Sequence, residues 1–113
     1  MALQKFVVFQ NDMTCAESFH RIHSVDHYRT ENVCISHMQV FKDSTAFNMG
    51  KAPILNFSIE CTDSSVFNSY FSLDAISPDS SNLYQQSYMY AKTLTNAGGQ
   101  FDYTTDTTDV LSY

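Results

Sequence analysis

Three of the four histidines of the chain lie close together, His20, His23 and His27, within the stretch FHRIHSVDHYR. On a helix their spacing of i, i+3 and i+7 would place all three on one face, where they could hold a zinc ion. On a strand, His23 and His27 would share a face and His20 would point away. The β-branched and aromatic residues among them favour a strand.

We therefore predict a polar strand face without a structural metal, cofactor or catalytic role. Two alternatives stay open: a small metal- or ligand-binding module built on His20, His23 and His27, and a surface whose charge changes near neutral pH. No carboxylate and histidine motif such as H-E-x-x-H accompanies the three histidines.

Other patterns that could support catalysis are weak. Cys15 and His20 lie near each other in the sequence, but a nucleophile and its base need contact in space and an orienting group. The carboxylates are scattered, with no pair spaced for acid–base work. Gly98 and Gly99 lack the Lys and Ser/Thr of a phosphate-binding loop. We expect a protein that is not an enzyme.

The chain has three cysteines, Cys15, Cys34 and Cys61. An odd number at wide spacing matches neither a zinc motif nor a full disulfide framework. Because cysteine is among the most frequently buried residues, we expect free, semi-buried thiols. One disulfide, or a bond to another chain, remains an open alternative.

Composition limits the classes of partner. The chain has 113 residues, a net charge of −6 and only six Lys and Arg, which suits one domain. Nucleic acids and anionic membranes attract clustered cations, so we expect neither as a partner. No apolar run approaches the roughly 20 residues of a membrane helix, and the N-terminus does not resemble a signal peptide. We expect synthesis and folding in a cytoplasm.

Alternating and β-branched stretches predict strands over residues 4–10, 32–41 and 54–61. In the last of these, one face carries Leu55, Phe57, Ile59 and Cys61. Between the second and third strands, Asp43 or Ser44 could cap one helical turn that Gly50 ends. Residues 66–73 look extended and could pair with residues 54–61 through a turn.

One convincing helix is predicted near residues 78–95. Ser77 can cap it, Pro78 suits the first helical position, and Asp79 complements the dipole. Its apolar stripe should face Leu55, Phe57 and Ile59 of the sheet, and comprises Leu83, Tyr84, Tyr88, Ala91 and Leu94. The predicted fold is α+β: a small antiparallel sheet of four to five strands packed with this one main helix.

Residues 1–99 are predicted to form the single α+β domain, and residues 100–113 a C-terminal tail. The tail is polar and rich in Thr, so it should be extended and form contacts, by adding a strand either to a partner or to its own domain. A tyrosine-rich helix face could pack in the core or contact another subunit. The candidate subunit contacts are Tyr84, Tyr88, Tyr90, Phe101, Tyr103, Val110, Leu111 and Tyr113.

Four short motifs occur in a fixed order: the start MAL-x-K, then ESFHRIHSV, VFKDSTAFNMGKAPI and SYMYAKTL. In this order they resemble a family of small bacteriophage virion proteins with an A-Y-x-R-I strand, an acidic-capped turn followed by Gly-Lys and Pro, and an A-Y-x-Y-L-K-x-L helix. The resemblance covers most of residues 1–95. Phe19 stands where the family has Tyr, and the tail extends beyond the family's helix.

The resemblance implies a minor structural protein without catalytic residues, present in the virion. It would mediate subunit contacts in the tail or baseplate or on the capsid surface, where a capsid cement or decoration protein is the specific alternative. The expected partners are other virion structural proteins and further copies of the chain in a symmetric assembly.

Overall fold

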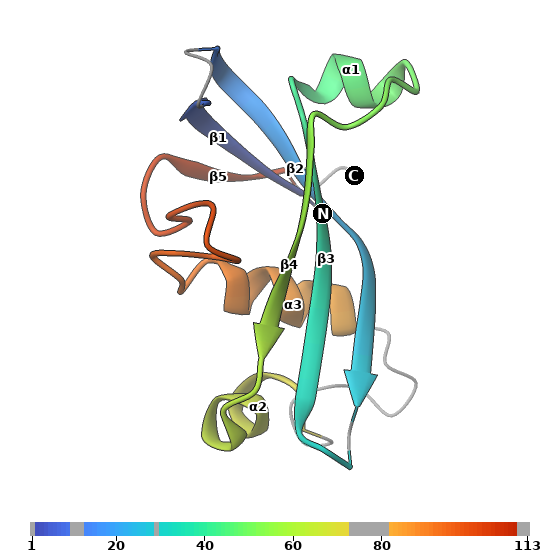
Figure 1. Ribbon diagram of the computed structural model, residues 1–113, viewed down its shortest axis with the longest axis vertical. Helices are drawn as coiled ribbons and strands as arrows, with labels where there is room; N and C mark the ends of the chain where they lie inside the picture. The colour runs from blue at the N-terminus through green and yellow to red at the C-terminus, as the bar shows by residue number, and fades with distance from the viewer. Residues whose placement is uncertain (1, 10–12, 29, 73–81, 111–113) are drawn as a thin grey trace.

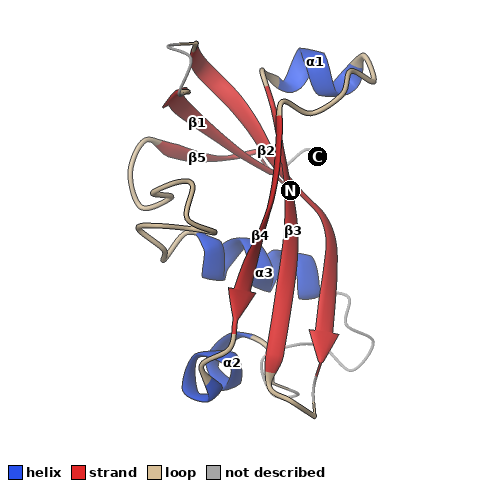
Figure 2. Ribbon diagram, viewed as in Figure 1, coloured by secondary structure: helices blue, strands red, loops and turns tan. Residues whose placement is uncertain are grey.

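The computed structural model of the protein describes residues 2–9, 13–28, 30–72 and 82–110. These residues form one five-stranded antiparallel sheet in the order β4-β3-β2-β1-β5, together with three helices (Figures 1 and 2). The α+β class and the number of strands agree with the prediction. The elements are β1 (Ala2–Val8), β2 (Thr14–Tyr28), β3 (Val33–Phe41), α1 (Ser44–Asn48), β4 (Leu55–Cys61), α2 (Ser64–Tyr70), α3 (Leu83–Ala91) and β5 (Thr107–Val110).

The main core lies between the sheet and α3, which crosses behind the sheet in the view of Figure 1. β4 alternates as predicted, with Ile59 and Cys61 buried on the covered face and Asn56, Ser58 and Glu60 exposed on the other. Leu55 and Phe57, which are partly buried, pack against the same core. The apolar stripe residues Tyr88, Ala91 and Leu94 join them in this core, as expected.

The opposite face of the sheet is mostly open, and α1 covers only one end of it. There Phe47 of α1 stacks on Phe19, with ring centroids 5.0 Å apart, and packs edge-on against Phe41. The guanidinium of Arg21 lies 5.1 Å from the Phe47 ring centroid. The predicted cap of α1 is confirmed, because the Asp43 carboxylate accepts a hydrogen bond from the Ala46 N–H.

Residues 66–72 do not extend the sheet, so the prediction of an extended segment was wrong for them; residue 73 lies outside the described residues. Residues 64–70 form α2, and the Asp63 carboxylate caps it by accepting hydrogen bonds from the N–H groups of Ser65 and Val66. Phe67 and Phe71, one helical turn apart, are both buried over the same end of the sheet. Helix capping and i, i+4 burial therefore prevail over the strand preference of the aromatic residues.

The predicted helix over residues 78–95 is shorter in the structure. α3 ends at Ala91, and the chain then turns through bonds from Thr93 N–H to Tyr90 O and from Leu94 N–H to Ala91 O. Such tight i to i+3 bonds commonly end a helix. The proposed capping residues Ser77, Pro78 and Asp79 lie outside the described residues.

Of the two alternatives for the C-terminal tail, the structure shows pairing with its own domain for residues 100–110. Phe101 and Tyr103 are buried in the main core, and β5 pairs antiparallel with β1. The physical reason is that β1 would otherwise expose a full hydrogen-bonding edge, and the two aromatic rings fill the core beside it. Of the tail's other proposed contacts, Leu111 and Tyr113 lie outside the described residues.

The turn at Gly98, just before this segment, packs closely against β4. Gly98 has φ +57°, and a Cβ atom added there would lie 2.5 Å from Cδ2 of Phe57 and 2.6 Å from the carbonyl oxygen of Ser58. Only glycine allows so close an approach. Gly99 also has positive φ, +73°, but a Cβ atom there would meet open space.

We predict that Gly98→Ala lowers the free energy of unfolding by about 1–3 kcal/mol more than Gly99→Ala does. Both variants carry the backbone strain of positive φ, so the difference between them isolates the clash with β4. Urea denaturation of the two proteins measures it. Equal losses would mean that this turn does not rest on β4.

Candidate functional site

A β-bulge in β2 separates the three clustered histidines. Ile22 is opposite Met38, but Ser24 is opposite His37, so one extra residue is inserted between them. His20 therefore points into the covered face, and His27 returns to that same face, where its ring stacks on Phe67. His23 lies exposed and lines a hollow on the open face.

The prediction that His23 and His27 share a face was wrong, because strand alternation was counted without the bulge. His20, His23 and His27 do not converge on one point. Within the described residues, no group of three or more His, Cys, Asp or Glu side chains could hold a metal ion. The alternative of a module built on these three histidines has no geometric support.

Tyr88, one of the candidate subunit contacts, supplies a hydrogen-bond acceptor at the bulge. The Tyr88 hydroxyl accepts a hydrogen bond of 2.7 Å from the N–H of Ile22, the residue at which the register shifts. Tyr88 is buried, and burial raises the pKa of its hydroxyl. It satisfies a backbone donor inside the core, so it is not available as a subunit contact.

A chain of buried hydrogen bonds links the C-terminal segment to the sheet. The Ser18 hydroxyl donates to the Lys5 carbonyl at 2.6 Å, so its oxygen must accept from Nε2 of His20, 2.8 Å away. Nδ1 of His20 then accepts from the Tyr103 hydroxyl at 2.6 Å. Nearby, the Lys5 ammonium donates to the Thr105 carbonyl at 2.7 Å. Each proton in the chain has one acceptor.

This chain requires a neutral imidazole. Burial lowers the pKa of His20 to about 3, and the Lys5 ammonium contributes to the lowering. Burial likewise raises the pKa of Tyr103 well above its usual value. Tyr103, another proposed subunit contact, therefore holds the C-terminal segment in place from inside the core, and the ring of Phe101 packs edge-on against His20.

The other proposed contacts divide between core and surface. Tyr90 is partly buried, packs against Tyr70 and Phe71, and shares a hydrogen bond with Cys61. Val110 is partly buried on β5. Tyr84 is 46% exposed and remains a surface residue. Tyr88 and much of the Tyr90 side chain thus pack in the core, which was one of the two alternatives for the tyrosine-rich helix face.

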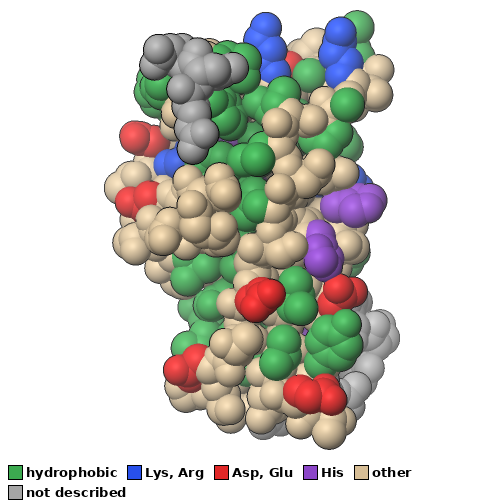
Figure 3. Space-filling view, viewed as in Figure 1, with side chains coloured by type: hydrophobic (Ala, Val, Ile, Leu, Met, Phe, Trp, Pro, Cys, Tyr) green, Lys and Arg blue, Asp and Glu red, His purple; other side chains and the backbone are tan. Residues whose placement is uncertain are grey.

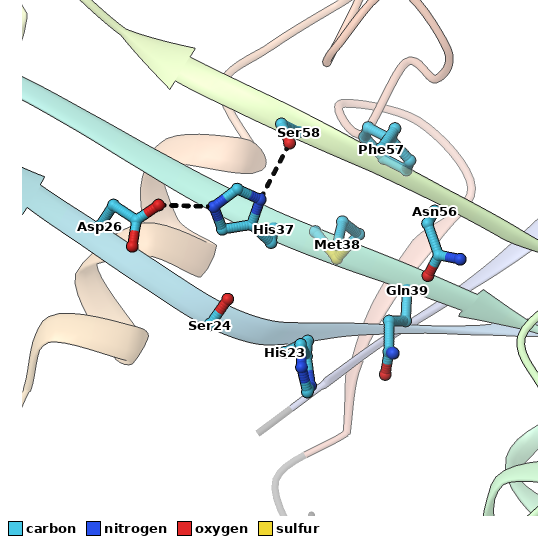
Figure 4. Close-up of a pocket in the computed structure, with 9 residues that line it drawn as sticks. All are labelled: His23, Ser24, Asp26, His37, Met38, Gln39, Asn56, Phe57 and Ser58. Atoms are coloured by element: carbon cyan, nitrogen blue, oxygen red, sulfur yellow. Dashed lines mark hydrogen bonds and ion pairs between the residues drawn. The ribbon is translucent and has the colours of Figure 1, made fainter.

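The open face of the sheet carries a polar row that runs across three strands. Asp26 of β2 contacts Nε2 of His37 on β3 at 2.7 Å, and Nδ1 of His37 lies 3.0 Å from the Ser58 hydroxyl on β4 (Figure 4). Imidazole side chains lie next to each other at mid-height on the right of the molecule in Figure 3. The row lies in a hollow of about 490 Å³ lined by His23, Ser24, Asp26, His37, Met38, Gln39, Asn56, Phe57 and Ser58.

A carboxylate, an imidazole and a hydroxyl in sequence can activate a nucleophile, but here solvent reaches the row. The side chains of His37 and Asp26 are 39% and 46% exposed, and such pairs contribute only about 0–1 kcal/mol. The row links β2, β3 and β4 across the open face. Alternation in the sequence places Ser58 on the polar face of its strand, but the face to which Asp26 projects depends on the bulge in β2.

A second hollow, of about 570 Å³, lies where β1 ends and β4 begins. None of the described residues that line it is charged. Val8 and Ile54 are 57% and 42% exposed there. We call this surface the β1–β4 groove; it is lined by Val7, Val8, Phe9, Met13, Ile54, Leu55, Gly99, Gln100 and Phe101.

Comparison of the chain with family models, with curated proteins and with solved structures gives no match in any of the three. In the part of the chain that the structure describes, no helix has both the length and the apolar character needed to cross a membrane.

We predict that Tyr103→Phe lowers the free energy of unfolding by about 1–3 kcal/mol, because it leaves Nδ1 of His20 buried without a donor. Tyr84→Phe removes the same hydroxyl from an exposed ring and should change stability by less than about 0.5 kcal/mol. Chemical denaturation of both variants makes the comparison. Similar losses in the two variants would show that the buried hydrogen bond contributes no more to stability than the exposed hydroxyl does.

We also predict a loss of stability in acid that originates at His20. Its folded-state pKa of about 3 is below the ordinary value of 6.5, so the unfolded chain binds the proton more readily. The contribution is present above pH 6.5 and is lost as the pH falls toward 3. Over this window wild type should lose up to about 1.4 kcal/mol per pH unit more than His20→Gln does. Parallel profiles from pH 7 to 4.5 would contradict this assignment.

Proposed function

We propose that the protein is a non-enzymatic minor structural component of a bacteriophage virion, repeated in a symmetric assembly. Its place would be in the tail or baseplate or on the capsid surface, with capsid cement as the specific alternative. The support from the sequence is the ordered set of short motifs in residues 1–95. The observation that carries the proposal is the pair of exposed aliphatic side chains, Val8 and Ile54, in the β1–β4 groove.

The described residues that line this groove carry no charge, in a chain whose net charge is −6. A net negative charge makes copies of the chain repel one another, and a contact surface without carboxylates does not add to that repulsion. Val8 and Ile54 expose aliphatic side chains at the groove, and burying such surface is worth about 25 cal/mol per Å². We assign the groove to an apolar segment of a neighbouring subunit in the particle.

One further surface suits repeated contacts. β5 is the last strand on its side of the sheet, so a partner strand could continue the sheet beyond it through main-chain hydrogen bonds. This edge lies on a different element from the groove, so variants can separate the two contributions.

The test is complementation of a phage that lacks the gene, with mass spectrometry of the purified particles. Wild-type protein should be recovered in particles, and Ile54→Asp should fold but be absent from them. Met89→Asp is the matched control, because Met89 is also an exposed aliphatic residue, 41% against 42%, but lies on α3. We expect Met89→Asp to be incorporated.

Two outcomes would count against the proposal. If Met89→Asp is excluded and Ile54→Asp is incorporated, the contact lies on α3 rather than in the groove. If wild-type protein is never found in particles, the protein is not a virion component. Circular dichroism of each purified variant confirms that exclusion does not result from misfolding.

A further inference from the structure

Two of the three cysteines are direct neighbours in the sheet. Cys34 of β3 and Cys61 of β4 are opposite each other in the antiparallel register. Both side chains point into the covered face, where they are 2% and 1% exposed and belong to one small core cluster. Both are free thiols in this structure. Cys15 is far from them in the sheet, opposite Val7 of β1.

The pairing geometry suits a covalent bond. Directly opposite residues in antiparallel strands have Cα atoms about 4.5–5.5 Å apart, and disulfides span Cα separations of about 4.4–6.8 Å. Side chains of opposite residues also project to the same side of the sheet. We infer that Cys34 and Cys61 are a modification site, at which an external disulfide oxidant closes an intramolecular cross-strand disulfide.

The balanced reaction uses a small-molecule disulfide such as oxidised glutathione. A thiolate of the pair attacks it, forms a mixed disulfide and releases one glutathione thiolate. The second cysteine, as its thiolate, then displaces the other glutathione, so the two protein thiols are oxidised and one glutathione disulfide is reduced to two thiols. The two protons leave to solvent or to the released thiolates.

The surroundings of the pair make this reaction slow in the closed fold. Phe67 and Phe71 cover the two sulfurs from the side of α2. Burial raises the pKa of Cys34 to about 12, and the neighbouring Cys61 and Asp26 add to the effect. Burial also raises the pKa of Cys61, although a hydrogen bond from Tyr90 partly opposes it. Thiolate and oxidant therefore meet when α2 opens locally.

Contacts at both ends of α2 help to hold this helix over the cysteine pair. The Asp63 carboxylate caps its first turn. At its other end, the Phe71 carbonyl accepts a hydrogen bond of 2.9 Å from Nε2 of His27, whose ring stacks on Phe67. Weakening the cap should raise the open fraction of α2. Because the Asp63 charge also raises the pKa of Cys61, Asp63→Asn, which keeps a capping side chain without the charge, is the control for that second effect. This inference does not depend on the proposed role in a virion.

The first experiment treats the full-length, reduced protein with oxidised glutathione and maps the peptides by mass spectrometry without reduction. We expect a peptide pair joined through Cys34 and Cys61, lighter by two hydrogens than the two free peptides. Cys15→Ser should keep this product, and Cys61→Ser should lose it. A bond from Cys15 to either of the others, or no Cys34–Cys61 product even at long times in dilute urea, would overturn the inference.

The second experiment tests whether local opening of α2 controls access to the pair. It measures the rate of disulfide formation in two further variants. Asp63→Ala removes the cap of α2 and should speed the reaction about fivefold. Asp43→Ala is the matched control, because it removes the equivalent cap from α1, which packs on the opposite face of the sheet. Equal rates in the two variants would show that opening of α2 does not control access to the pair.

Discussion

The hydrogen bond from the Ile22 N–H to the Tyr88 hydroxyl lies at the bulge in β2. After this bulge, the alternation of side chains between the two faces of the sheet is shifted by one residue. A bulge interrupts the backbone pairing and leaves a donor that needs a partner in the core. Because a tyrosine of α3 supplies that partner, the bulge and the helix position depend on each other. The other polar arrangements in the sheet follow from this one shift.

Before the bulge, β2 directs His20 into the core, where it must be neutral and where Tyr103 completes its hydrogen bonds. This places the C-terminal segment inside the domain. After the bulge, β2 directs Asp26 to the open face beside His37 and returns His27 to the covered face above Cys34. One inserted residue thus creates a buried chain, an exposed polar row and the environment of the cysteine pair.

The surfaces left over by this arrangement are where a partner would bind. Most aromatic rings that might have served as contacts are used internally, Tyr88 and Tyr103 through their hydroxyls as well as their rings. Two of the exposed apolar side chains, Val8 and Ile54, lie together in the β1–β4 groove. A role in assembly is compatible with a fold that keeps its polar chemistry buried or solvated and leaves apolar surface at one end.

Local patterns in the sequence determined the α+β class, the face of β4 that carries Ile59, and the Asp43 cap of α1, because alternation and capping act between residues close in the chain. Tertiary packing decided the rest. Residues 64–70 are helical because Phe67 and Phe71 bury together, and the tail folds back because β1 needs an edge partner. The bulge in β2 has no local signal, so only pairing with β3 and the hydroxyl of Tyr88 could decide which histidines share a face.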